Sequence, residues 1–292
     1  MNSIFELLFS KNFITKEQHQ AINEYQKLEL FSIRNELLFL LYISILLFSS
    51  GVGIIIYKNI DTIGHTILLI LLAALTATCF YFCYKKAKGF SKQEVSFDNP
   101  LYDYLVLFTT ILMCTLIGYF QYNLNVQNSD YSLATLFSGT AALGMAYYFD
   151  NKSALIIGVT ALGSFIGLSL KIRTIFEHTI FNDNSLLIAG ISFGALLLAW
   201  QWYSERINLK THFSFVLLTF AFHLLAITSL SGSSQDGYWF LYLLVLGSVL
   251  FYFYKKSITL NAISWYVFVL FYGYIGFNML LFRVIYTLRL DE

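Results

Sequence analysis

One histidine stands inside a long apolar stretch of the sequence, where ionisable side chains are uncommon. His223 lies between Phe222 and Leu224, near the middle of the apolar residues 212–230. A histidine in such a setting needs a hydrogen-bond partner or a water-filled cavity, which makes His223 a candidate polar site. Because no second ionisable residue stands at a matching depth, we favour a neutral histidine bonded to a neighbouring helix. A functional role is the alternative.

A second group of chemically capable residues gathers in the polar segment at residues 171–184. A loop that carries a histidine together with acidic and basic side chains could hold a metal ion or a solute. The apolar residues between them, such as Ile172 and Phe176, favour instead an amphipathic turn at a membrane surface. We keep this loop as a candidate site, made of Lys171, Arg173, Glu177, His178 and Asp183.

The remaining chemistry-bearing residues give no catalytic motif. Cys79 and Cys83 are one helical turn apart, and this spacing binds a metal only if further ligands join them, so we expect packing thiols. The sequence carries no HExxH zinc pair, no GxxxxGK phosphate loop and no GxGxxG fingerprint, and we expect no nucleophile elbow. We therefore name no catalytic residue, no metal ligand and no cofactor.

The elements that must position these residues are long apolar helices. Hydrophobic residues make up 58% of the chain and charged residues only 12%, against roughly 25% charged in soluble domains. Apolar stretches of this length fit membrane-spanning helices, in which every backbone group is hydrogen-bonded internally. We predict an all-α, polytopic helical membrane protein. The predicted spans are residues 37–57, 63–84, 101–122, 131–149, 153–170, 185–203, 212–230, 238–254 and 259–282.

The charges indicate orientation and exclude one class of partner. Eighteen basic residues against seventeen acidic ones give no net field for nucleic acid, so we expect no nucleic-acid partner. Basic residues are retained on the cytoplasmic side of a membrane. With the N-terminus inside, the cytoplasmic segments hold thirteen of the eighteen basic residues. We therefore predict a cytoplasmic N-terminus and an outside C-terminus.

The even-numbered spans all end in aromatic residues that run directly into charge or a polar turn. Residues 81–86 and 251–256 are two examples, each closing in a pair of lysines. We favour an ordinary interfacial belt, in which rings lie at headgroup depth and lysines reach toward water. A basic site for lipid headgroups is the alternative.

Small residues recur at four-residue spacing inside two spans. Gly163 and Gly167 form one pair, and Gly190 and Gly194 form the other. Such pairs let helix backbones approach closely, so both are candidate helix-packing faces. We favour packing within one chain, and a homo-oligomer is the alternative.

The N-terminal residues 1–36 are polar enough to lie outside the membrane. Thr15 and Gln18 have the spacing of a capping box, which predicts a helix start at this point. The segment reads as a small helical hairpin that is too short to be stable alone. We favour docking on a protein partner or on the chain itself over a passive role in membrane insertion.

The N-terminal quarter carries a family resemblance. The turn at residues 11–18 and the glycine-containing end of the first span, which leads to Asp61, resemble the bacterial predicted-membrane-protein family called domain of unknown function 2157. Asn12-Phe13 replaces the usual glycine region, and Ile60 stands where that family has a tryptophan. The resemblance implies a multi-pass protein of the bacterial cytoplasmic (inner) membrane, and it supplies no activity and no catalytic residue.

Three classes of function stay open. We favour a non-enzymatic assembly or interaction subunit, embedded in the lipid bilayer, whose partner contacts residues 1–36. A transporter or channel for a small solute or lipid is the alternative, and it would need a wet cavity at His223. A membrane-embedded enzyme is the third, and it would need Glu177, His178 and Asp183 to converge.

Overall fold

The computed structural model describes most of the chain as two separate units. The units are Met1–Asn59 and Ile60–Glu292. Each is described by itself below. The described residues are 11, 15–18, 34–58, 64–95, 100–123, 132–171, 184–235 and 237–290.

Among the described residues of the first unit, the long helix is α3 (Arg34–Lys58). Upstream of it, the Thr15 N–H donates to Gln18 Oε1 at 3.0 Å, and the Gln18 N–H donates to Thr15 Oγ1 at 3.3 Å. These two reciprocal bonds are a capping box, so that prediction is confirmed. Most of the predicted hairpin at residues 1–36 lies outside the described residues.

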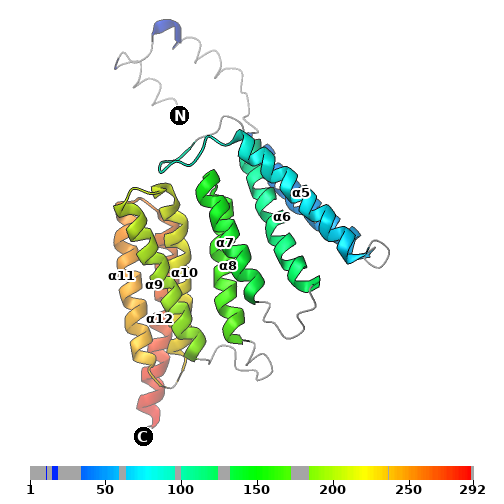
Figure 1. Ribbon diagram of the computed structural model, residues 1–292. Coiled ribbons are helices and arrows are strands. Elements are labelled where there is room, and N and C mark those ends of the chain that lie inside the picture. Colours follow the sequence, from blue (N-terminus) through cyan, green and yellow to red (C-terminus); the bar gives the residue numbers. More distant parts are fainter. Residues whose placement is uncertain are drawn as a thin grey trace. The chain divides into compact units, whose positions relative to one another are not determined.

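The second unit is a succession of long helices (Figure 1). All regular structure in the described residues is helical, which confirms the predicted all-α class. The helices are α5 (His65–Lys86), α6 (Leu101–Asn123), α7 (Ser132–Phe149), α8 (Lys152–Lys171), α9 (Asn184–Arg206), the short 3-10 helix η1 (Thr211–Phe213), α10 (Ser214–Ser233), α11 (Trp239–Thr259) and α12 (Ile263–Leu290).

Eight helices in the described residues are long and apolar enough to cross a membrane. The chain is therefore a multi-pass membrane protein, and its lipid-facing surface contacts the bilayer. The long helix left out is α7, which has only 18 residues and carries serine, threonine and glycine along its length. Whether α7 completes a set of nine spans stays a prediction.

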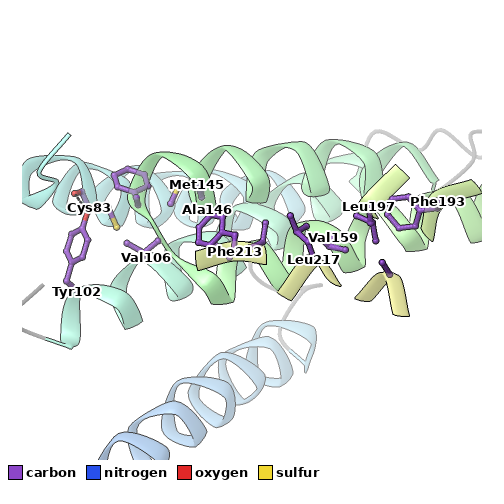
Figure 2. Packing of buried hydrophobic residues seen from close by; sticks show 14 residues of the cluster. Cys83, Tyr102, Val106, Met145, Ala146, Val159, Phe193, Leu197, Phe213 and Leu217 are labelled. Atoms are coloured by element: carbon purple, nitrogen blue, oxygen red, sulfur yellow. Dashed lines mark hydrogen bonds between the residues drawn. The ribbon is translucent and has the colours of Figure 1, made fainter. Parts of the chain in front are cut away.

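Consecutive helices of the second unit are neighbours, and two buried apolar clusters hold them together. The first cluster joins α5 through α10, and Figure 2 shows it running from Cys83 and Tyr102 at one end to Phe193 and Leu197 at the other. The second joins α10, α11 and α12 around Phe222. Helix α10 contributes to both clusters and so links the two halves of this unit.

The α7–α8 pair makes the closest backbone approach that we describe. A Cβ atom built on Gly139 of α7 would lie 3.2 Å from the Leu162 backbone nitrogen of α8. A Cβ on Gly158 of α8 would lie 3.1 Å from the Leu143 backbone nitrogen of α7. These reciprocal contacts bring the two helices together like a small-residue pair in a membrane bundle.

Candidate functional site

Three turns between helices meet at one buried carboxylate. Asp150, between α7 and α8, has a side chain only 2% exposed. Its Oδ1 lies 2.8 Å from Lys210 Nζ and 2.7 Å from His212 Nε2, both in the α9–α10 connection. Its Oδ2 accepts a hydrogen bond of 2.5 Å from the N–H of Val95, which follows α5. We call Asp150, Lys210 and His212 the Asp150 cluster.

Lys210 is the most unusual member of the Asp150 cluster, because its side chain is fully buried. Lysine is almost never found fully buried without a counter-charge. The ammonium lies at ion-pair distance from the Asp150 carboxylate. Its Nζ also lies 5.8 Å from the centre of the Phe90 ring. The Asp150 charge therefore supplies the polar partner that this burial requires.

Backbone bonds tie the same turns together. The Lys210 N–H donates to the Lys92 carbonyl at 2.7 Å, which joins the α9–α10 connection to the segment that follows α5. Asn151 Nδ2 donates to the Asp103 carbonyl at 3.0 Å, while Asn151 Oδ1 accepts from the Ala154 N–H and caps α8. The Asp150 cluster is thus the centre of a wider set of bonds between turns.

Both partners of the buried ion pair have strained backbones. Asp150 has φ of 57° and Lys210 has φ of 49°. A residue with a side chain in this left-handed region costs on the order of 1–3 kcal/mol unless local bonds support it, and lysine lacks the short polar chain that eases it. Such conformations persist where the surroundings fix them. Here the fixing contacts are those of the Asp150 cluster.

An exposed ion pair borders the cluster. Lys152 Nζ, at the start of α8, lies 2.9 Å from Glu94 Oε1. The hydrogen bond from Lys152 holds the pKa of Glu94 below its usual value. Both side chains are more than half exposed, so solvent screens this pair and it contributes little to stability.

The contacts of the Asp150 cluster indicate a structural role, in which one carboxylate links three turns. Both carboxylate oxygens are already in contact with groups of this chain, from two other turns. A general base needs an oxygen available to a substrate proton, and here each oxygen has a partner. The arrangement therefore holds three turns in one rigid surface.

His223 bonds to a neighbouring helix. Its Nδ1 lies 2.9 Å from the Tyr272 hydroxyl of α12, and the rings of Phe222 and Phe268 lie beside it. This is the kind of partner that the sequence analysis favoured. A functional role of the pair stays a prediction.

The two glycine pairs face different surroundings. A Cβ on Gly194 would lie 2.6 Å from the Leu225 side chain, and a Cβ on Gly190 would lie even closer to the Thr228 side chain, so this pair packs on α10. A Cβ on Gly163 would only touch Phe193, and Gly167 has open space around its Cβ position. Gly190 and Gly194 of α9 therefore face α10 of the same chain.

The α9 glycines and the serine between them also spell a motif known from hydrolases. Gly190-Ile191-Ser192-Phe193-Gly194 spells Gly-x-Ser-x-Gly. The nucleophile elbow of hydrolases needs its serine on a sharp turn between a strand and a helix. Ser192 lies well inside α9, so the string is part of a helix.

Most of the candidate loop site cannot be placed, whereas Cys83 can. Arg173, Glu177, His178 and Asp183 lie outside the described residues, as does the Lys171 side chain. Cys83 is buried, with its Sγ 3.3 Å from Thr109 Oγ1. Among the described residues, no three His, Cys, Asp or Glu side chains come together as a metal site would require.

Comparison with known proteins places half of the chain in a family. Residues 6–155 match a family model described as "Predicted membrane protein (DUF2157)". The resemblance seen in the first quarter is confirmed, and the match extends through α7 and the Asp150 turn. Neither the curated proteins nor the solved structures gave a match.

Proposed function

The chain belongs to the family of predicted membrane proteins called DUF2157, and on that premise we propose that it is a non-enzymatic interaction subunit of a bacterial inner-membrane assembly. Its N-terminus is cytoplasmic and its C-terminus is outside. We propose two separate contact regions for partners: residues 1–36, and the surface that the Asp150 cluster braces.

The observation that carries the proposal is the buried tie between three turns. Asp150 contacts Lys210, His212 and the Val95 N–H at once, and the ion pair has almost no exposure to solvent. Breaking such a pair leaves an uncompensated buried charge, so the turns are held in one fixed arrangement. A fixed surface loses less conformational freedom when it binds, which favours a docking role.

The positions of the basic residues support the cytoplasmic placement of that surface. The turns joined by the Asp150 cluster include Lys92, Lys152 and Lys210, and α5 ends in two further lysines. Basic residues near span ends are retained in the cytoplasm. The N-terminal segment, on our topology, lies on the same side.

The test is crosslinked co-purification of the full chain from native membranes. We expect one protein in stoichiometric amount with the intact chain, and its loss when residues 1–31 are deleted. The double variant Thr15→Ala/Gln18→Ala is the full-length counterpart, since it removes both capping-box bonds and weakens the helix start by about 0.5–2 kcal/mol. It should retain less partner than the intact chain.

Membrane insertion of each variant is checked by its resistance to carbonate extraction. An intact chain that purifies alone would overturn the proposal. Equal retention by the intact and shortened chains would place the contact elsewhere than residues 1–36.

A further inference from the structure

The end of α5 and the segment after it have a composition unlike the other described turns. Residues 85–92 carry Lys85 and Lys86 in the last turn of α5, and Lys88 and Lys92 after it, and all four residues are exposed. A cluster of four or more basic residues directly after a membrane span is a pattern associated with acidic phospholipids. The structure shows three further features of these lysines: their depth relative to the membrane, the anchoring of their backbone and the charges around them.

The depth of the lysines follows from the length of α5. This helix has 22 residues, and at a rise of 1.5 Å per residue it spans about 33 Å. The hydrocarbon core of a bilayer is roughly 30 Å thick. Lys85 and Lys86 close the helix, so they reach the level of the phosphates, and the segment continues along that level.

The segment is fixed in place by the turns beside it. The Lys92 carbonyl accepts from the Lys210 N–H, and the Val95 N–H donates to Asp150. Gly89 turns the chain between the end of α5 and these anchors with φ of 84°, a conformation that suits glycine. The lysines are therefore presented from an ordered backbone, which lowers the entropy lost on binding a headgroup.

Two acidic groups of the adjoining turns are engaged elsewhere. Glu94 pairs with Lys152, and Asp150 is buried against Lys210 and His212. Neither of these two carboxylates is positioned to neutralise Lys85 or Lys86. These two lysines consequently contribute a positive field that an anionic headgroup would complement.

Aromatic rings complete the surface. Phe90 stands in the middle of the segment with 55% of its surface exposed. At the end of α5, the exposed ring of Tyr84 stacks on Tyr148 of α7, with 6.2 Å between the ring centres. Aromatic rings favour the interface between headgroups and hydrocarbon, where they flank the lysines.

We propose that residues 85–92 form a binding site for the headgroups of anionic phospholipids. The Lys85 and Lys86 ammonium groups contact the lipid phosphate, and Phe90 lies among the first carbons of the lipid chains. The occupant is a lipid and not a soluble phosphate, because the bilayer itself holds the phosphate at this depth. The inference does not depend on the proposed interaction with a protein partner.

The experiment places the full chain in nanodiscs that contain equal amounts of phosphatidylglycerol and phosphatidylcholine. Native mass spectrometry then gives the ratio of the two lipids that stay bound after release. The variant Lys85→Gln/Lys86→Gln should lower the preference for phosphatidylglycerol at least about fivefold, since one lysine near a membrane surface changes affinity by roughly that factor.

A matched pair of lysines at the end of α11 gives the control. Lys255→Gln/Lys256→Gln removes the same number of charges near the end of α11, where Lys256 Nζ lies 4.0 Å from Glu205 Oε1 and Lys255 Nζ lies 4.5 Å from the centre of the Phe251 ring. We expect it to change the preference less than twofold. An equal loss in both variants would show a general basic belt and overturn the proposal, as would no loss in either.

Two further measurements separate the possible sources of binding. Salt at about 0.5 M shortens the screening length to roughly 4–5 Å and should reduce the preference of the unaltered chain. Inorganic phosphate at 10 mM should leave it unchanged. Displacement of the lipid by inorganic phosphate would mean a soluble-anion site and would overturn the proposal. Equal thermal unfolding of the variants shows that the fold is intact.

Discussion

At the scale of single residues, Asp150 is the position on which most other contacts depend. We predict that Asp150→Asn lowers the free energy of unfolding by about 3–5 kcal/mol, because it keeps the shape of the side chain but leaves the fully buried Lys210 without a counter-charge. The measurement is unfolding by denaturant in detergent micelles, followed by circular dichroism.

Two controls test whether the cause is the stranded charge. Asp150→Asn/Lys210→Met removes both charges and should recover most of the lost stability, since neutral replacement of a buried pair costs little. Glu94→Gln breaks an exposed pair and should cost less than about 1 kcal/mol. A double variant as unstable as the single one would contradict the assignment.

The Asp150 cluster also shows where sequence reasoning stops. The capping box at Thr15 and Gln18 is local, and its spacing is sufficient to predict it. The partner of His223 is distant, but the cost of an unpaired polar group in an apolar setting predicts that one exists. Asp150 and Lys210 are 60 positions apart in polar turns, and from the sequence each would be expected to be an ordinary solvent-exposed charge. Only the fold brings them together.

At the scale of helices, the α7–α8 pair gives the clearest test of close packing. We predict that Gly158→Ala destabilises the chain by about 1–3 kcal/mol, although alanine is the better helix former. The added Cβ would lie 2.8–3.1 Å from Leu143, and one of the atoms in its way belongs to the backbone. Thermal unfolding in detergent measures the effect.

Gly144 of α7 is the matched control. A Cβ at Gly144 meets nothing within 4 Å, so Gly144→Ala should be neutral or stabilising by up to about 1 kcal/mol. Equal effects at the two positions would show that helix propensity and not packing decides. The four-residue spacing of small residues led the sequence analysis to Gly163, Gly167, Gly190 and Gly194. It missed Gly139 and Gly158, because spacing alone does not say which glycine faces another helix.

At the scale of the whole molecule, the number of spans decides on which side the C-terminus lies. Eight helices have the length and apolarity of a span, and α7 is the long helix left out. The Asp150 cluster nevertheless joins the turns that follow α5, α7 and α9. Helix α6 begins after the turn that follows α5 and is long enough to cross the membrane. If α6 crosses, α7 must cross back for its C-terminal end to reach the Asp150 cluster. Its 18 residues give about 27 Å, close to the hydrocarbon thickness.

We therefore predict nine spans, with the N-terminus in the cytoplasm and the C-terminus outside. Alkaline phosphatase, which is active only outside the cytoplasm, is fused in turn after residues 90, 127, 150, 178, 208 and 292. Activity is expected after 127, 178 and 292 and not after 90, 150 and 208, and a fluorescent protein that matures only in the cytoplasm should give the opposite pattern. If α7 did not cross, the fusions at 127 and 150 would report the same side. That result would contradict the nine-span topology, although the contacts of Asp150 with the neighbouring turns would remain.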